Sequence, residues 1–167
     1  MGAHDFDFWI GDWDVLGPLG KTVGRNTITV MFEGQTGGML HEHWHGNGGV
    51  EGRSINGYDA SRGCWHQTWM DSSGGVLLLE GGLVPLETGG AAMVLEGWAS
   101  AEDEDDLGRV DRQRITWTTN DEGAEVRQVW ETSTDDGKTW SVAFDGRYRR
   151  PSVGTTALDK QHCHRRL

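Results

Sequence analysis

Four histidines and one glutamate in the middle of the chain have the residue types and spacing for metal or acid–base chemistry. His41, His43 and His45 alternate along one segment, and His66 lies in a later segment. Alternate residues of a β-strand share a face, so three imidazoles at this spacing have the arrangement of a divalent-metal site. Glu42 falls on the opposite face. If that face is buried, desolvation raises the pKa of Glu42 toward neutrality, which suits proton transfer.

Three antiparallel strands joined by two turns are predicted to position these residues, over positions 40 to 71. The two hairpin registers can be tested against each other, because a slip of one residue would move every side chain to the other face. Both registers keep the same residues together. The predicted pairs are Trp44 with Gly52, Glu42 with Ser54, Ser54 with Trp69, Asn56 with Gln67, and Tyr58 with Trp65.

One of the two faces is predicted to point inward because it carries most of the aromatic area. Large aromatic side chains favour burial, whereas histidine and arginine side chains are costly to bury. The His41, His43 and His45 face is therefore predicted to be exposed. Polar residues among aromatic walls are typical of a ligand cavity. The inward set is Glu42, Trp44, Ser54, Asn56, Tyr58, Trp65, Gln67 and Trp69.

Two later strands, Arg112–Trp117 and Val126–Glu131, extend the same interior. If the face with Arg114 and the face with Gln128 and Trp130 point inward, they add polar groups to the cavity. Arg114 is then a candidate counter-ion for Glu42, because a buried carboxylate needs a partner or a raised pKa.

Length and composition favour one domain with many short strands. The chain has 167 residues, with 26 glycines, nine tryptophans and only three prolines. A formal net charge of −11 argues against nucleic acid and anionic membranes as partners. The sequence shows no signal peptide or membrane-spanning run, and we interpret Cys64 and Cys163 as free thiols, so a cytoplasmic location is expected.

The opening of the chain carries a resemblance to a known fold. The segment Phe8-Trp9-x-Gly11-x-Trp13 resembles the first strand of lipocalin-like (calycin) barrels, and the motifs around Glu42, Ser54, Gln67 and residues 133–140 follow in order. The whole set is similar to a bacterial calycin family of unknown function. The resemblance implies an all-β, antiparallel lipocalin-like barrel of about 8–10 strands over residues 1–150, with a tail over 151–167.

Cofactors are constrained by the same comparison. Calycin barrels related to nitrobindin carry a proximal histidine in the last strand, whereas the corresponding segment here, Val142–Tyr148, has none. The sequence therefore argues against haem and leaves a divalent metal open, with His162, Cys163 or His164 of the tail as further ligands.

Two further motifs are interpreted as structural. Residues 133–140, Ser-Thr-Asp-Asp-Gly-Lys-Thr-Trp, match the Asp-box hairpin of sialidase propellers, and a single copy implies a rigid hairpin rather than a glycosidase. The five acids at 102–106 are interpreted as a solvated loop, with a weak calcium or partner site as the alternative.

Three functions remain open on the sequence. The first is binding of a small hydrophobic or aromatic molecule inside the barrel, and a homodimer is compatible with it. The second is a cofactor-free isomerase, cyclase or hydratase that uses Glu42 as acid or base. The third is a metal protein that uses His41, His43 and His45. The predicted ligand contacts are Trp13, Glu42, Trp44, Ser54, Asn56, Tyr58, Trp65, Gln67, Trp69, Arg114, Gln128 and Trp130.

Overall fold

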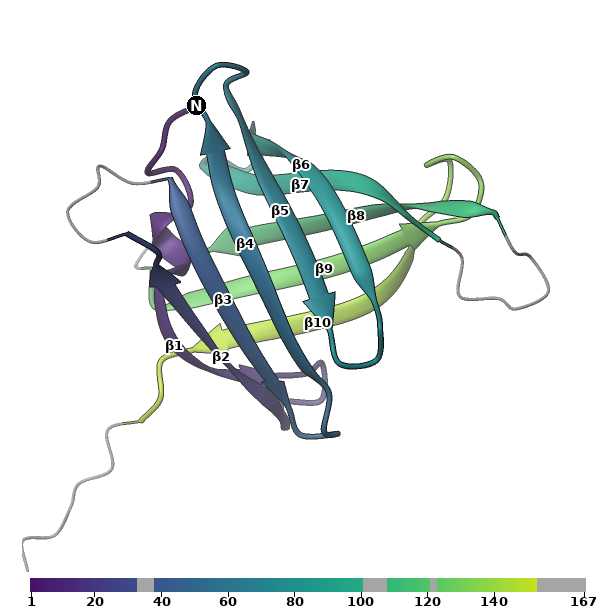
Figure 1. The fold of residues 1–167 in the computed structure, drawn as a ribbon. Helices are drawn as coiled ribbons and strands as arrows, with labels where there is room; N and C mark the ends of the chain where they lie inside the picture. The colour runs from purple at the N-terminus through teal and green to yellow at the C-terminus, as the bar shows by residue number, and fades with distance from the viewer. Residues whose placement is uncertain (33–37, 101–107, 121–122, 153–167) are drawn as a thin grey trace, which may run out of the picture.

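The chain forms a closed barrel of ten antiparallel strands, each paired with its neighbours in sequence (Figure 1). The computed structural model describes residues 1–32, 38–100, 108–120 and 123–152. A short 3-10 helix, η1 (Asp7–Trp9), precedes the first strand. The strands are β1 (Gly11–Leu16), β2 (Thr22–Val30), β3 (Met39–Gly46), β4 (Glu51–Asp59), β5 (Cys64–Asp71), β6 (Val76–Pro85), β7 (Ala91–Ser100), β8 (Val110–Thr119), β9 (Glu125–Ser133) and β10 (Ser141–Arg149).

Closure comes from β1, which pairs with β2 on one side and with β10 on the other. Each strand therefore has a neighbour on both sides, although the β1–β10 pairing joins only Asp14–Leu16 to Arg147–Arg149. The predicted all-β antiparallel barrel is confirmed, and its strand number lies at the upper end of the predicted range.

The central three strands have the predicted registers. Glu42 lies opposite Ser54 between β3 and β4, and Asn56 lies opposite Gln67 between β4 and β5. The predicted inward face is buried or half-buried, and the alternating face with His43 and His45 is outside. Burial of the aromatic rings decided the orientation, as expected from their large apolar area.

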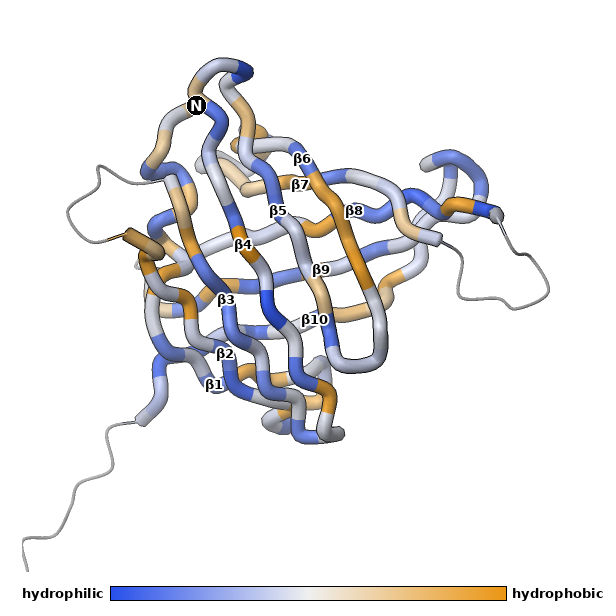
Figure 2. Tube along the Cα trace, in the orientation of Figure 1, coloured by the Kyte–Doolittle hydropathy of each residue, from blue (hydrophilic) through white to orange (hydrophobic). Residues whose placement is uncertain are grey.

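β6 runs without interruption from Val76 to Pro85. Its first residues contribute to both faces, with Leu77 buried and Leu78 exposed, within the hydrophobic stretch seen in Figure 2. Pairing with β7 runs through Gly81 and Gly82 and continues to Pro85. A Cβ at Gly81 would lie 2.0 Å from the Val94 carbonyl oxygen, so glycine here permits close approach of the two strands.

The hairpin between β9 and β10 has the predicted local hydrogen bonds. The Asp135 carboxylate accepts from the backbone N–H groups of Lys138 and Thr139, at 3.1 and 2.8 Å. Ser133 Oγ accepts from the N–H of Gly137, whose φ is +82°. Side chains of Ser133 and Asp135 thus bind backbone amides of the turn, while its rigidity and its relation to sialidases stay predictions.

Some predictions concern residues outside the part of the chain that the structure describes. The acidic run at 102–106 and the tail with His162, Cys163 and His164 lie outside the described residues. Cys64 is a free cysteine. Within the described ranges, no helix is long and apolar enough to cross a membrane.

Candidate functional site

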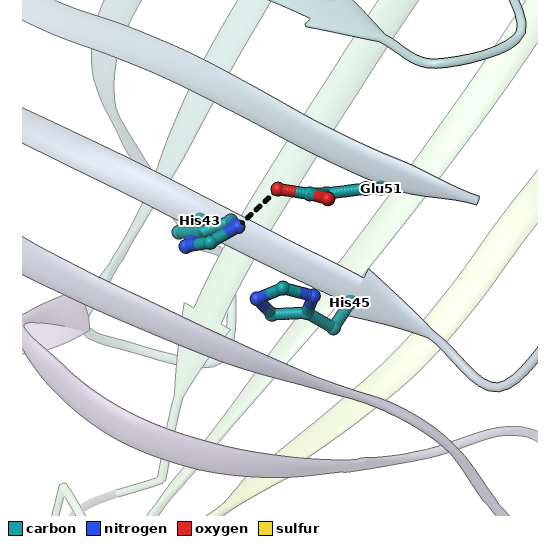
Figure 3. Close-up of side chains that lie close together, drawn as sticks. All are labelled: His43, His45 and Glu51. Atoms are coloured by element: carbon teal, nitrogen blue, oxygen red, sulfur yellow. Dashed lines mark hydrogen bonds and ion pairs between the residues drawn. The ribbon is translucent and has the colours of Figure 1, made fainter. Parts of the chain in front are cut away.

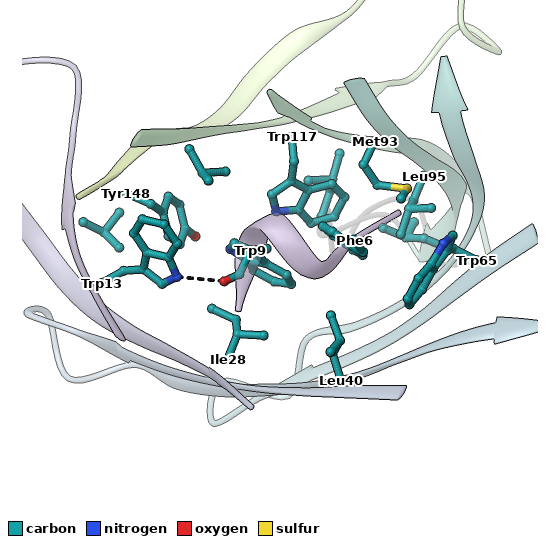
Figure 4. Packing of buried hydrophobic residues seen from close by; sticks show 14 of the residues in the cluster. Phe6, Trp9, Trp13, Ile28, Leu40, Trp65, Met93, Leu95, Trp117 and Tyr148 are labelled. Atoms are coloured by element: carbon teal, nitrogen blue, oxygen red, sulfur yellow. Dashed lines mark hydrogen bonds between the residues drawn. The ribbon is translucent and has the colours of Figure 1, made fainter. Parts of the chain in front are cut away.

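One end of the barrel is filled by the N-terminal segment. Phe6, just before η1, and Trp9, its last residue, are fully buried. Both pack against Trp117 of the barrel wall, and Phe6 also packs against Trp65 (Figure 4). Trp13 completes this plug and donates from Nε1 to the Trp9 carbonyl oxygen at 2.8 Å. The plug leaves the other end of the barrel for a cavity.

A layer of buried polar side chains lies on the inner face of β2 to β5, and it includes the Glu42 carboxylate. Oε1 of Glu42 accepts from Asn26 Nδ2 at 2.7 Å, and Oε2 accepts from Ser54 Oγ at 2.6 Å. Asn56 Nδ2 donates to Ser54 Oγ at 2.9 Å, and Gln67 Nε2 donates to Asn56 Oδ1 at 2.9 Å. From Gln67 through Asn56 and Ser54 to Glu42, each side chain donates to the next, and Asn26 donates to Glu42 from the opposite side.

The Glu42 carboxyl is buried, and the hydrogen bonds described for it come from neutral groups. Burial raises its pKa from 4.5 to about 7, against the opposing effect of the hydrogen bonds from Ser54 and Asn26. Burial also raises the pKa of Tyr148 well above its usual value, and the Tyr148 hydroxyl donates to Gln128 Oε1. A carboxyl group in this state can hold or release a proton near neutral pH.

A cavity of about 210 Å³ lies between the polar layer and the end of the barrel opposite the plug. Its lining includes Val50 and Ala143, which are exposed, so the cavity reaches the surface there. The other lining residues are Glu42, Trp44, Gln67, Trp69, Asp71, Leu77, Ile115, Gln128, Trp130, Phe144 and Tyr148.

Glycines on the inner face leave room for the aromatic walls. A Cβ at Gly52 would lie 2.1 Å from the Trp69 ring, and a Cβ at Gly24 would lie 2.5 Å from the Trp44 ring. Each ring therefore packs against a neighbouring strand at a glycine, where a larger residue would collide with it.

The structure brings half of the predicted ligand contacts to the cavity. Those that line it are Glu42, Trp44, Gln67, Trp69, Gln128 and Trp130. Ser54 and Asn56 are not among the lining residues and belong to the hydrogen-bond chain that ends at Glu42. Trp13, Trp65 and Tyr58 belong to the plugged end, where the Tyr58 hydroxyl donates to the Met1 carbonyl oxygen at 2.9 Å.

Arg114 does not point into the cavity, contrary to the prediction. It lies on the outer face of β8, donates to Glu131 Oε2 at 2.9 Å, and its guanidinium carbon lies 4.0 Å from the Trp140 ring centroid. The expected pairing with Glu42 is therefore wrong. Ile115 and Trp117 take the inner face of β8, and strand alternation then places Arg114 outside.

Phe144 and Tyr148 are lining residues that the sequence reasoning missed. They share the inner face of β10 with the buried Gly146, while Asp145 and Arg147 alternate with them. The same rule that oriented β3 to β5, aromatic residues in and charged residues out, identifies both. Leu77 and Ile115 follow from the same alternation on β6 and β8.

The histidine cluster lies outside the barrel and differs from the predicted set. His43, His45 and Glu51 bring their ligand atoms within 4.8 Å of one another (Figure 3), whereas His41 is not part of this group. His43 Nε2 lies 2.6 Å from Glu51 Oε1. Arg53 Nη2 lies 3.1 Å from each of these two atoms. A metal ion at this place would therefore adjoin a guanidinium, which favours an ion-pair network over a metal site.

Comparison of the chain with protein-family models and with curated protein sequences finds no match. The fold is compatible with the lipocalin-like resemblance, and the bacterial calycin family remains a prediction.

Proposed function

We propose that the barrel binds a small, mainly apolar molecule in the cavity above Glu42. One observation carries this proposal: an aromatic-walled cavity ends on a buried polar layer that still has free hydrogen-bonding capacity. Gln67 is 3% exposed and lines the cavity, and its Oε1 has no hydrogen-bond partner within the described part of the chain. A buried acceptor without a donor costs free energy, and a ligand with a donor group would satisfy it.

The volume limits the ligand to one ring with short substituents. An apolar cavity of about 150 Å³ is large enough to hold benzene. The cavity here is about 210 Å³. A monocyclic aromatic molecule with a two-atom or three-atom side chain therefore fits, with its ring among Trp44, Trp69 and Trp130.

A cavity-filling substitution and its matched control test this proposal. Ile115→Phe adds volume inside the cavity, whereas Ile55→Phe makes the same change on the outer face, where Ile55 is 49% exposed. Isothermal titration calorimetry with 2-phenylethanol is expected to show saturable 1:1 binding to the unaltered protein and to Ile55→Phe. Ile115→Phe should bind at least about tenfold more weakly. Equal affinity of all three proteins would contradict binding in the cavity.

The buried carboxyl supports a second candidate, proton transfer on a bound molecule. Glu42 lines the cavity, and burial places its pKa at about 7. It would remove a proton from the carbon next to a carbonyl group, which leaves an enolate, and return the proton to that carbon or to its neighbour. This candidate needs no cofactor and includes isomerisation.

Deuterium exchange tests the second candidate without knowledge of the natural substrate. In D₂O, the protein would exchange the α-protons of phenylacetone faster than buffer does, as followed by proton NMR. Glu42→Gln should lose this acceleration while it retains the fold, judged by circular dichroism. Exchange at the buffer rate with the unaltered protein would leave binding as the function.

A further inference from the structure

Two carboxyl groups line the cavity, and both can carry a negative charge. Glu42 lies at the inner end and Asp71 near the mouth, and no lysine, arginine or histidine among the described residues lines the cavity. Asp71 is engaged by its own turn, where its Oδ1 accepts from the N–H groups of Ser73 and Gly75. Glu42 accepts from Asn26 and Ser54 only, so its charge is not balanced by a cation in the described contacts.

The apolar walls also favour positive charge. Trp44 and Phe144 meet edge to face with ring centroids 5.9 Å apart, and Trp69 and Trp130 complete the aromatic lining. The faces of aromatic rings carry partial negative charge and attract organic cations, most strongly where water is excluded. The indole N–H groups of Trp69 and Trp130 are already used, by Asp71 and Gln113. Their ring faces remain available to a ligand.

These observations rest on the proposed binding function and narrow its ligand class. We propose that the cavity takes a small organic cation, a protonated primary amine joined to one aromatic ring. Its ammonium group donates to the Glu42 carboxylate and to Gln67 Oε1, and its ring lies among the tryptophans. The chain's formal net charge of −11 favours the approach of such a cation.

Other classes of polar head group fit the same lining less well. A carboxylate or phosphate beside Glu42 would either place two unbalanced negative charges in a buried site or require Glu42 to take up a proton, and both lower its affinity at pH 8. A neutral hydroxyl would satisfy Gln67 but would form no ion pair with Glu42. The order of affinity is therefore cation, then alcohol, then anion.

The affinities for the cation and for the alcohol should depend on pH in different ways, because ligand binding is linked to the ionisation of Glu42. Tyr148 on β10 and Asp71 on β5 are the other titratable groups of the lining, and the polar side chains that contact Glu42 from β2 and β4, Asn26 and Ser54, do not titrate. An ammonium group stabilises the Glu42 carboxylate and lowers its pKa from about 7. Affinity for the cation should therefore rise from pH 6 to pH 8, and affinity for the alcohol should stay level or fall.

Three probes with the same skeleton test the inference by calorimetry at pH 8: 2-phenylethylammonium, 2-phenylethanol and phenylacetate. The cation should bind about tenfold more tightly than the alcohol, as expected for a hydrogen bond between charged groups, and the anion should bind most weakly. If the alcohol or the anion binds best, the inference is wrong and the binding function stands. If none of the three binds, the proposed function itself is wrong.

Matched variants assign the preference to Glu42. Glu42→Gln removes the charge and should abolish both the preference for the cation and its pH dependence, with the affinity for 2-phenylethanol retained. Glu80→Gln removes an equal charge from the outer face of β6 and should leave all affinities unchanged. If Glu42→Gln does not fold, the pH series on the unaltered protein decides. A cation affinity that is level or lower at pH 8 than at pH 6 overturns the inference.

Discussion

The Ser54 hydroxyl donates to Oε2 of Glu42 at 2.6 Å, across the predicted β3–β4 register. This bond links the Glu42 carboxylate to the chain of amide hydrogen bonds that begins at Gln67. It also opposes the effect of burial on the Glu42 pKa. Burial therefore dominates the Glu42 pKa, and a side chain on the neighbouring strand acts against it.

Ser54→Ala should destabilise the protein and raise the Glu42 pKa further. Loss of the hydroxyl leaves buried groups on Glu42 and Asn56 without a partner, at a cost of about 1–3 kcal/mol. Urea denaturation measures the change in unfolding free energy, and carbon-13 NMR of the Glu42 carboxyl measures its pKa. Ser61→Ala, which removes an exposed hydroxyl bonded to Asp59, is the control. A smaller loss for Ser54→Ala than for Ser61→Ala would contradict the central role of this bond.

Stability should fall as pH rises through the titration of Glu42. The folded pKa is about 7 and the model-compound value is 4.5, so between these values the folded state holds a proton that the unfolded state has released. The contribution to stability is complete below pH 4.5 and is lost by the time pH exceeds 7, by about 3 kcal/mol in all.

Urea denaturation at pH 5, 6, 7 and 8 checks this linkage. Glu42→Gln cannot titrate, so the difference between the two proteins isolates the glutamate from the seven histidines of the chain. Glu42→Gln should gain stability relative to the unaltered protein between pH 5 and pH 8. Parallel pH profiles would show that Glu42 ionises as it does in water.

Gly52→Ala should weaken ligand binding by moving a wall of the cavity. The new methyl group would lie 2.1 Å from the Trp69 ring, so the ring must turn away from β4 and into the cavity. Affinity for 2-phenylethylammonium should fall about tenfold, the effect of losing roughly 1.4 kcal/mol of binding free energy. Gly48→Ala in the preceding turn, where a Cβ would meet nothing within 4 Å, should bind like the unaltered protein.

Arg53→Ala should increase the affinity of the outer histidine cluster for Zn²⁺. The guanidinium lies 3.1 Å from both His43 Nε2 and Glu51 Oε1, and its repulsion of a divalent ion is worth about 2 kcal/mol even in water. Calorimetric titration with Zn²⁺ should therefore show about tenfold or greater tightening. A double variant that also carries His43→Ala should lose the gain. Tight Zn²⁺ binding by the unaltered protein would instead support the metal-binding function.

The sequence was most informative where two independent constraints agreed. The two hairpin registers between β3 and β5 kept one set of residues together, and the aromatic area of that set fixed its direction. Arg114 was misplaced because its strand was considered by itself, without comparison of the apolar area on its two faces. Ile115 and Trp117 would have decided that comparison.

The alternation of residues along single strands predicts less well which inner residues fill the barrel and which line a cavity. The inner aromatic residues divide between a plug around Trp9 and cavity walls such as Trp69, and alternation along a strand is the same in both places. The difference is set by height along the barrel axis, which depends on how the strands are staggered. Gly81 shows a similar limit, because its role depends on contact with Val94 of the neighbouring strand.

The location of a bound ring tests the account most directly, by methyl NMR of protein labelled at isoleucine and leucine. Titration with 2-phenylethylammonium should produce saturable ring-current shifts at Leu77 and Ile115, which line the cavity. Ile55 and Leu78 on the outer face, 49% and 60% exposed, should not shift. Shifts confined to Ile55 and Leu78, or no saturable shift at any methyl group, would contradict a ligand site inside the barrel.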